Sequence, residues 1–185
     1  ENWKAKGMTM CEIPPIRMLV LTLTGRCNFK CLYCYASEQD PVDMTEETAI
    51  AAVALAHVSK NQFLLQFSGG EPLLQFPLIR KVVDFVEKNH VNAQMQIQTN
   101  GALLTKDIGK WLFDHHVGIG ISCDGRPELM NSLRVSKDGD RSSQKVIQAF
   151  QNLGESNIEA GITCVVTDDT VEQLDGIVDM AYFYG

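Results

Sequence analysis

The sequence lacks any apolar segment long enough to cross a membrane. A transmembrane helix needs about 20 consecutive apolar residues, and no run in the 185-residue sequence approaches that length. The N-terminal residues Glu-Asn-Trp-Lys-Ala-Lys also lack the apolar centre of a signal peptide. We therefore expect a cytoplasmic protein without a membrane partner.

Positive charge is scarce as well. The 16 Lys and Arg residues are outnumbered by 23 Asp and Glu, which gives a formal net charge of -7. The basic residues are also scattered, whereas contact with a phosphate backbone needs a positive stripe. We expect no nucleic-acid partner, and we interpret the acidic balance as a solubility feature.

The spacing of the cysteines excludes a secreted disulfide framework. Three of the six cysteines are crowded into one short segment as Cys27, Cys31 and Cys34, whereas those at positions 11, 123 and 164 stand alone. This distribution is typical of ligands in a reducing compartment. We expect Cys123 and Cys164 to be small buried residues within strands.

An apolar, β-rich run followed by an amphipathic helical stretch occurs five times along the chain. This alternation predicts an α/β fold of parallel βα units, which right-handed crossovers curl into part of a barrel. We expect residues 1–15 to form a lead segment, residues 16–185 to form the core, and the sequence to be a piece of a longer protein. The predicted strands span residues 18–23, 63–67, 94–98, 117–121 and 160–166.

Apolar stripes place the helices between these strands. Thr45 is the predicted N-cap of the first helix, and the apolar stripe of that helix is expected at Ile50, Val53, Ala54 and Val58. The second helix carries a stripe at Ile79, Val82, Val83 and Val86, with the three- and four-residue spacing of a helix face. The last helix is expected to use Val171, Leu174, Ile177 and Val178.

Every unusual motif falls where a predicted strand ends. In parallel βα arrays the carboxyl ends of the strands and the loops after them form the functional edge. Four polar motifs should therefore converge on one edge of the sheet. They are the cysteine triplet, Ser-Gly-Gly-Glu-Pro at 68–72, Gln-Thr-Asn-Gly at 98–101, and Ser-Cys-Asp-Gly at 122–125.

The cysteine triplet has no fourth ligand nearby. A structural zinc ion or an electron-carrying cubane cluster normally takes four protein ligands. Three thiolates at this spacing suit a cubane whose fourth iron is left open to bind another molecule. The triplet therefore predicts a [4Fe-4S] cluster with one free coordination site.

Together the four motifs resemble those of radical S-adenosyl-L-methionine (radical SAM) enzymes. The matching elements are Cys27-x3-Cys31-x2-Cys34 with Tyr33, then Gly69-Gly70-Glu71-Pro72, Thr99-Asn100-Gly101, and Ser122-x-Asp124-Gly125 with Arg134 downstream. The last element is most similar to SPASM-type peptide and protein maturases, such as anaerobic sulfatase-maturating enzymes. The resemblance implies a partial (β/α)6 TIM-like barrel and an oxidoreductase that modifies a peptide or protein.

The resemblance also implies roles for the residues around the cluster. Cys27, Cys31 and Cys34 would hold three irons, and the amino and carboxylate groups of S-adenosyl-L-methionine (AdoMet) would chelate the fourth. Gly69 and Gly70 would let the backbone approach the methionyl ammonium. The remaining members of this set are Glu71, which shapes the turn and helps neutralise the cation, and Tyr33, which borders the adenine opposite the strand around Val165.

The other motif residues would hold the rest of the cofactor. Thr99, Asn100 and Ser122 are expected to hydrogen-bond the ribose or the methionyl part. Arg134 is expected to bind the carboxylate in a bidentate manner. Asp124 is a candidate catalytic residue, with capping of its loop as the alternative.

The resemblance implies two partners, a peptide or protein substrate and an external electron donor of the flavodoxin or ferredoxin type. The sequence departs from the family pattern at two of the motif positions. Cys123 replaces an aliphatic residue, and residues 130–134 follow the usual pattern before the arginine only in part. Two other functional hypotheses remain open. One is a non-enzymatic iron–sulfur or zinc module, and the other is a radical SAM enzyme that acts on a small molecule or activates a glycyl-radical enzyme.

Overall fold

A five-stranded parallel sheet forms the centre of the computed structural model, which describes residues 15–184 apart from 39, 59 and 169. Its strand order is β1-β3-β4-β5-β7, so successive βα units lie side by side as right-handed crossovers require. The predicted α/β class and the parallel units are confirmed. The strands are β1 (Met18–Thr22), β3 (Phe63–Ser68), β4 (Ala93–Thr99), β5 (Val117–Ser122) and β7 (Gly161–Thr163).

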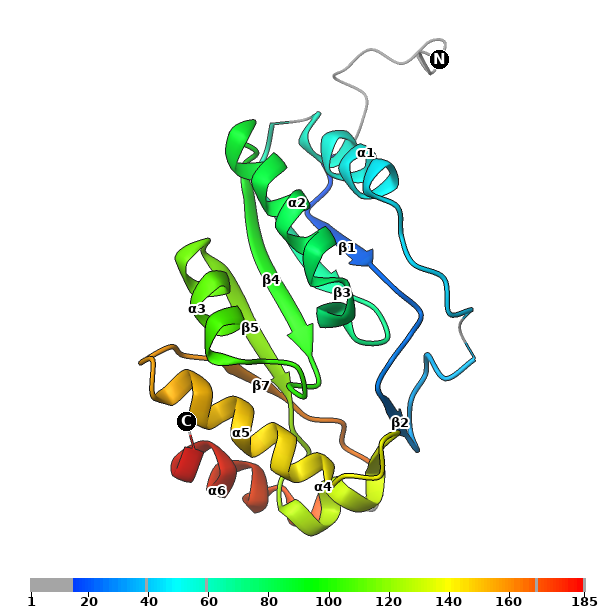
Figure 1. Ribbon diagram of the computed structural model, residues 1–185, viewed down its shortest axis with the longest axis vertical. Coiled ribbons are helices and arrows are strands. Elements are labelled where there is room, and N and C mark those ends of the chain that lie inside the picture. Colours follow the sequence, from blue (N-terminus) through cyan, green and yellow to red (C-terminus); the bar gives the residue numbers. More distant parts are fainter. Residues whose placement is uncertain (1–14, 39, 59, 169, 185) are drawn as a thin grey trace.

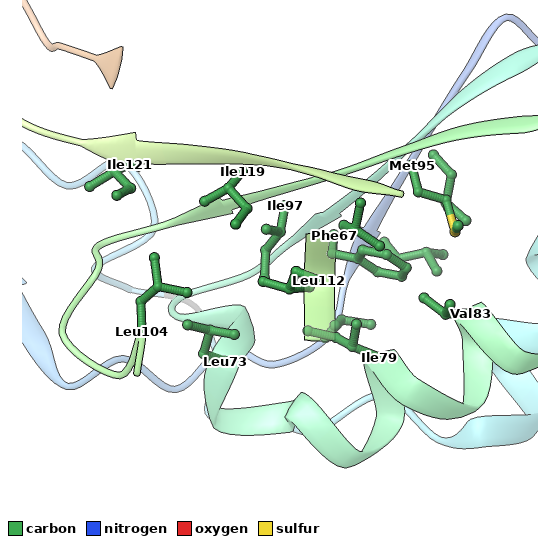
Figure 2. Close-up of a cluster of buried hydrophobic side chains, with 14 of the residues drawn as sticks. Phe67, Leu73, Ile79, Val83, Met95, Ile97, Leu104, Leu112, Ile119 and Ile121 are labelled. Atoms are coloured by element: carbon green, nitrogen blue, oxygen red, sulfur yellow. The ribbon is translucent and has the colours of Figure 1, made fainter. Parts of the chain in front are cut away.

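Helices cover one face of this sheet (Figure 1). Strand β3 shows the alternation, since Phe63, Leu65 and Phe67 are fully buried while the residues between them are half-buried. In Figure 2 the strand residues Phe67 and Ile97 lie among Ile79 of α2 and Leu112 of α3. The long helices are α1 (Glu46–His57), α2 (Phe76–Lys88), α3 (Lys106–Asp114), α5 (Ser142–Gly154) and α6 (Asp175–Tyr184).

The helix predictions are confirmed for α2 and only in part for α1. All four residues of the α2 stripe are buried. Thr45 caps α1, because its side chain accepts a hydrogen bond from the Thr48 N–H. The α1 stripe is confirmed at Val53, which is buried, and wrong at Ala54, which is exposed. The other buried residues of α1 are Ala49 and Ala56.

Several short elements lie between the long helices and the strands of the sheet. Strand β2 (Phe29–Cys31) pairs antiparallel with β6 (Arg134–Ser136), so that Cys31 lies directly opposite Arg134. Helix α4 (Pro127–Leu133) leads into β6, in a stretch that the sequence indicated only as a polar loop. The other short elements are the 3-10 helices η2 (Pro72–Gln75) and η3 (Val171–Gln173).

The last unit departs most from its prediction. Strand β7 ends at Thr163, so residues 164–166 lie outside the sheet. Cys123 is fully buried as expected, but both it and the half-buried Cys164 follow a strand instead of lying within one. The predicted face of the last helix is also wrong in part, since Val178 is 69% exposed and Val171 and Leu174 are exposed as well. Cys11 lies outside the described residues, and none of the described helices has the length and apolarity of a membrane span.

Candidate cofactor-binding site

The four sequence motifs meet in a cavity of about 310 Å³ at the carboxyl edge of the sheet. Ten of the predicted site residues line it, and so does Val165. The other two predicted residues, Glu71 and Asp124, do not line the cavity and are buried in the protein next to it. The predicted lining residues are Cys27, Cys31, Tyr33, Cys34, Gly69, Gly70, Thr99, Asn100, Ser122 and Arg134.

Hydrogen-bond donors surround the sulfur of Cys27. The Phe29 N–H lies 3.4 Å from this sulfur, and Asn100 Nδ2 lies 3.8 Å from it. Asn100 Nδ2 also donates to Asn28 Oδ1 at 2.7 Å, which fixes the direction of its amide. These donors favour a negatively charged sulfur, as a metal-bound thiolate is.

The three thiols are close enough to affect one another. Burial raises the pKa of Cys27 and of Cys31 above the ordinary value, and the neighbouring cysteines raise both further. Among the described residues, no three His, Cys, Asp or Glu side chains converge closely enough to hold a single metal ion. A four-iron cluster binds each thiolate to a different iron, so its ligands stand further apart.

The two glycines at 69 and 70 pack against the backbone of the cysteine segment. The Gly70 N–H donates to Thr24 O at 2.7 Å, and the Glu71 N–H donates to Arg26 O at 2.9 Å. A Cβ atom on Gly70 would lie 2.3 Å from Arg26 O, and one on Gly69, at a φ of +150°, would lie 2.6 Å from Thr24 O. Neither position tolerates a side chain, because backbone occupies the space.

Glu71 joins the loops after β3 and β4. Its Oε1 accepts hydrogen bonds from Thr99 Oγ1 at 2.6 Å and from the Leu73 N–H at 3.0 Å, while Oε2 accepts from the Asn100 N–H at 2.8 Å. The side chain is fully buried. Burial raises the pKa of Glu71, and the three donors act in the opposite direction. Glu71 therefore positions the Thr99–Asn100 segment.

A buried network connects the cysteine segment to the ends of β5 and β7. Arg134 Nη1 donates to the Tyr33 hydroxyl at 2.8 Å, and that hydroxyl donates to Asp124 Oδ2. The other oxygen of Asp124 accepts from the Val165 N–H at 3.2 Å. These contacts support capping of the loop by Asp124, the alternative to its predicted catalytic role.

Arg134 carries a buried N–H group that no protein atom in the described part of the chain accepts. Its side chain is 6% exposed, and its Nε is one of two buried side-chain atoms without a hydrogen-bond partner among the described residues. Burial opposes the charge, but Tyr33, Cys31 and Asp124 together raise the pKa of Arg134. A buried guanidinium with a free N–H beside the cysteines suits an anionic ligand, such as a carboxylate.

No role was predicted from the sequence for Gln98 or Thr163, which also line the cavity. Gln98 Nε2 donates to Ser122 Oγ at 3.1 Å, and Thr163 Oγ1 donates to Gln98 Oε1 at 3.0 Å. The amide crosses β5 above Gly120, where a Cβ atom would lie 2.5 Å from Gln98 Oε1. The alternation of glutamine with apolar residues along β4 was the available signal, because it places all the amides on one face.

Fold and cavity define an α/β enzyme class that holds its cofactor at the carboxyl edge of a partial barrel. Residues 21–181 match the model of the Radical SAM superfamily. The chain therefore belongs to the radical SAM superfamily, whose enzymes use a [4Fe-4S] cluster and AdoMet.

Curated relatives include peptide- and protein-maturing enzymes. An uncharacterised protein of Methanocaldococcus jannaschii is 37% identical over 172 residues, which cover 92% of this chain and 60% of that protein. The cysteine-type anaerobic sulfatase-maturating enzyme of Clostridium perfringens is 28% identical over 177 residues, which cover 89% of this chain and 48% of the enzyme. The chain thus spans 48% to 60% of the length of these relatives.

Solved structures agree with the sequence relatives. The structure of native anSMEcpe with bound AdoMet and Kp18Cys peptide has a TM-score of 0.82 at 26% identity, covering 91% of this chain and 48% of the other. SuiB of Streptococcus suis bound to S-adenosylmethionine has a TM-score of 0.71 at 18% identity, covering 90% of this chain and 38% of the other, and it supports the fold alone. These findings confirm the predicted fold class, the resemblance to maturases and the cofactor pair.

Proposed function

We propose that the protein containing this chain abstracts a hydrogen atom from a peptide or protein substrate. The observation that carries the proposal is the convergence of three cysteines, a glycine loop and a buried, incompletely paired arginine on one cavity. The cofactor pair would supply reductive cleavage of the AdoMet sulfonium to methionine and a 5′-deoxyadenosyl radical, which takes the hydrogen. The maturases among the relatives support the substrate class.

The chain's own residues divide into ligands and positioning groups. Cys27, Cys31 and Cys34 would bind the irons, with the Phe29 N–H and the Asn100 amide as donors to the sulfur of Cys27. Thr99 Oγ1 already donates to Glu71 and accepts from the Gly101 N–H, so its only proton is used within the protein. We assign Thr99, Asn100 and Glu71 to holding the site in shape.

Two polar side chains remain available to AdoMet. Ser122 Oγ accepts from Gln98, which leaves its own proton free to donate into the cavity. Arg134 Nε is also free, and the charge of this group would attract the methionyl carboxylate. The ring of Tyr33 lines the cavity while its hydroxyl binds Asp124, which suits a role beside the adenine.

An electron donor of the flavodoxin or ferredoxin type would dock beside the cysteines. A second cavity, of about 600 Å³, is lined by all three cysteines and by the exposed residues Lys30 and Lys137. In the described part of the chain neither lysine forms an ion pair. Two free cations in a protein of net charge -7 suit an acidic partner.

The test is AdoMet cleavage by the anaerobically reconstituted protein with dithionite as reductant. We expect iron and sulfide in equal amounts and formation of 5′-deoxyadenosine. Zinc without iron or sulfide would favour the non-enzymatic module. Cleavage that is stimulated by a small metabolite, and by no peptide, would move the proposal to the small-molecule branch.

The docking proposal has its own control. The charge reversals Lys30→Glu and Lys137→Glu should slow cluster reduction by an acidic flavodoxin about tenfold at low salt and leave reduction by dithionite unchanged. Lys88→Glu is the matched control, because Lys88 is 77% exposed on α2. Equal slowing in all three variants would contradict the assigned face.

A further inference from the structure

The sheet face opposite the helices is uncharged. Within the five strands, every residue that points away from the helices is apolar, glycine, or a neutral hydroxyl or amide. These residues are exposed or half-buried, whereas their neighbours in sequence are mostly buried. A face of this kind has no group for an ion pair with a phosphate or a carboxylate, and it offers only neutral hydrogen bonds.

Two glutamines lie side by side in the middle of this uncharged face. The register of β3 and β4 places Gln66 opposite Gln96, and Gln96 Nε2 donates to Gln66 Oε1 at 2.9 Å. Their one mutual hydrogen bond leaves Gln66 Nε2 as a donor and Gln96 Oε1 as an acceptor. Neither atom is among the buried, unpartnered atoms of the described residues, so both face accessible space.

The next strand leaves room above this pair. Gln96 is in register with Gly118 of β5, and the row nearer the cavity places Gln98 beside Gly120 and Gly161. Gly118 is exposed, and a Cβ atom on it would make only ordinary contacts, with no neighbour closer than 3.7 Å, so the packing does not require glycine here. The two glutamine rows are two residues apart, roughly 6.7 Å along the strands.

We propose that Gln66 and Gln96 bind the backbone of one residue of an extended substrate peptide. The carbonyl oxygen of that residue would accept from Gln66 Nε2 and its N–H would donate to Gln96 Oε1, because these two groups of one residue point to the same side of an extended chain. The peptide would run over the position of Gly118. This inference rests on the proposed function and adds the residues that read the substrate. The bound residue would lie next to Gln98, which lines the cofactor cavity and is two residues nearer than Gln96 to the carboxyl end of β4.

The first test needs no variant. The cluster-loaded chain, labelled with ¹⁵N, is titrated with the blocked tripeptide acetyl-Gly-Ser-Gly-amide, and the side-chain amide resonances of the glutamines are followed. We expect those of Gln66 and Gln96 to shift most. The tri-sarcosine analogue with a dimethylamide end, which has no N–H to donate, should bind about tenfold more weakly.

Matched substitutions test the two residues separately. Gln66→Leu and Gln96→Leu should each raise the tripeptide Kd about tenfold. In Gln96→Leu the preference for the N–H-bearing peptide over the sarcosine analogue should also disappear. Gln94→Leu is the control, because Gln94 lies on the same strand and face one row further from the cavity, and its Kd should stay within about twofold.

Gly118→Leu tests the site without touching an amide, since its side chain would fill the space above the pair. It should weaken tripeptide binding while the chain keeps its unfolding midpoint. AdoMet binding is measured in every variant, and we expect no change. Unaltered tripeptide Kd values in Gln66→Leu and Gln96→Leu, or no tripeptide binding to a wild-type chain that binds AdoMet, would overturn this inference and leave the proposed function standing. Failure of the wild-type chain to bind or cleave AdoMet would instead overturn the proposed function.

Discussion

Replacing Glu71 by glutamine should loosen the whole cofactor site. The substitution keeps the shape of the side chain but turns one carboxylate oxygen into an N–H donor. With Oε1 still accepting from Thr99 and Leu73, the new amide nitrogen faces the Asn100 N–H, which now lies 2.8 Å from Oε2. A donor then meets a donor in a fully buried position.

The expected cost follows from these contacts. An unsatisfied buried N–H costs about 1–3 kcal/mol. Each of the two remaining hydrogen bonds becomes weaker by about 1 kcal/mol, because its acceptor is no longer charged. Relief of the buried charge offsets part of this sum. We expect Glu71→Gln to lower the free energy of unfolding by about 2–4 kcal/mol, or the urea midpoint by about 1–2 M.

The assay is urea unfolding of the metal-free chain, followed by circular dichroism. Glu159→Gln is the control, because Glu159 is exposed, and it should change stability by less than about 0.5 kcal/mol. A Glu71→Gln variant as stable as the control, with weakened AdoMet binding, would refute the reasoning. It would show that the carboxylate acts on the ligand and not on the loops.

Three further predictions test other parts of the site. Gly70→Ala should cost about 1–3 kcal/mol of unfolding free energy, since its Cβ would lie 2.3 Å from Arg26 O, and a urea midpoint equal to wild type would count against the packing reason. Arg134→Lys keeps the charge but loses the planar fork, so the AdoMet Kd measured by calorimetry should rise about tenfold, and an unchanged Kd would exclude direct contact. Lys145 holds the pKa of Asp138 below its ordinary value, so the stability from this pair should be present at neutral pH and be lost as the pH falls below about 4. Asp138→Asn should remove that part of the acid dependence of the unfolding midpoint, and an identical pH profile would contradict the pairing.

Local patterns in the sequence were sufficient for the sheet and for the position of the site. Each strand and its following helix has its own periodicity, and parallel topology then brings the strand ends to one edge. The α1 stripe went wrong at Ala54 because alanine fits either side of a helix, so the apolar pattern of an alanine-rich helix points weakly to one face. The prediction for the last unit was wrong in part because its valines suggested burial, whereas Val171 of η3 and Val178 of α6 are exposed.

Contacts between segments far apart in the sequence could not be predicted from local patterns. The pairing of β2 with β6 joins two three-residue strands, too short for any periodicity, and it alone explains why Arg134 lies beside Cys31. Glu71 was expected to shape its turn and to help neutralise the cofactor, but its hydrogen bond with the Asn100 N–H could not be predicted, because it depends on the fold of another loop. The side of the sheet on which Gln98 lies could have been predicted, because the two-residue period of β4 places its glutamines on the face opposite the helices.

The central claim is that Cys27, Cys31 and Cys34 hold a cluster with one iron open to AdoMet. The most direct measurement is the electron paramagnetic resonance spectrum of the reduced, anaerobically reconstituted protein, recorded before and after AdoMet is added. We predict a [4Fe-4S]⁺ signal whose g values shift on addition and which is lost when any one of the three cysteines is replaced by alanine. A signal that AdoMet leaves unchanged, or one that survives loss of a cysteine, would contradict the claim.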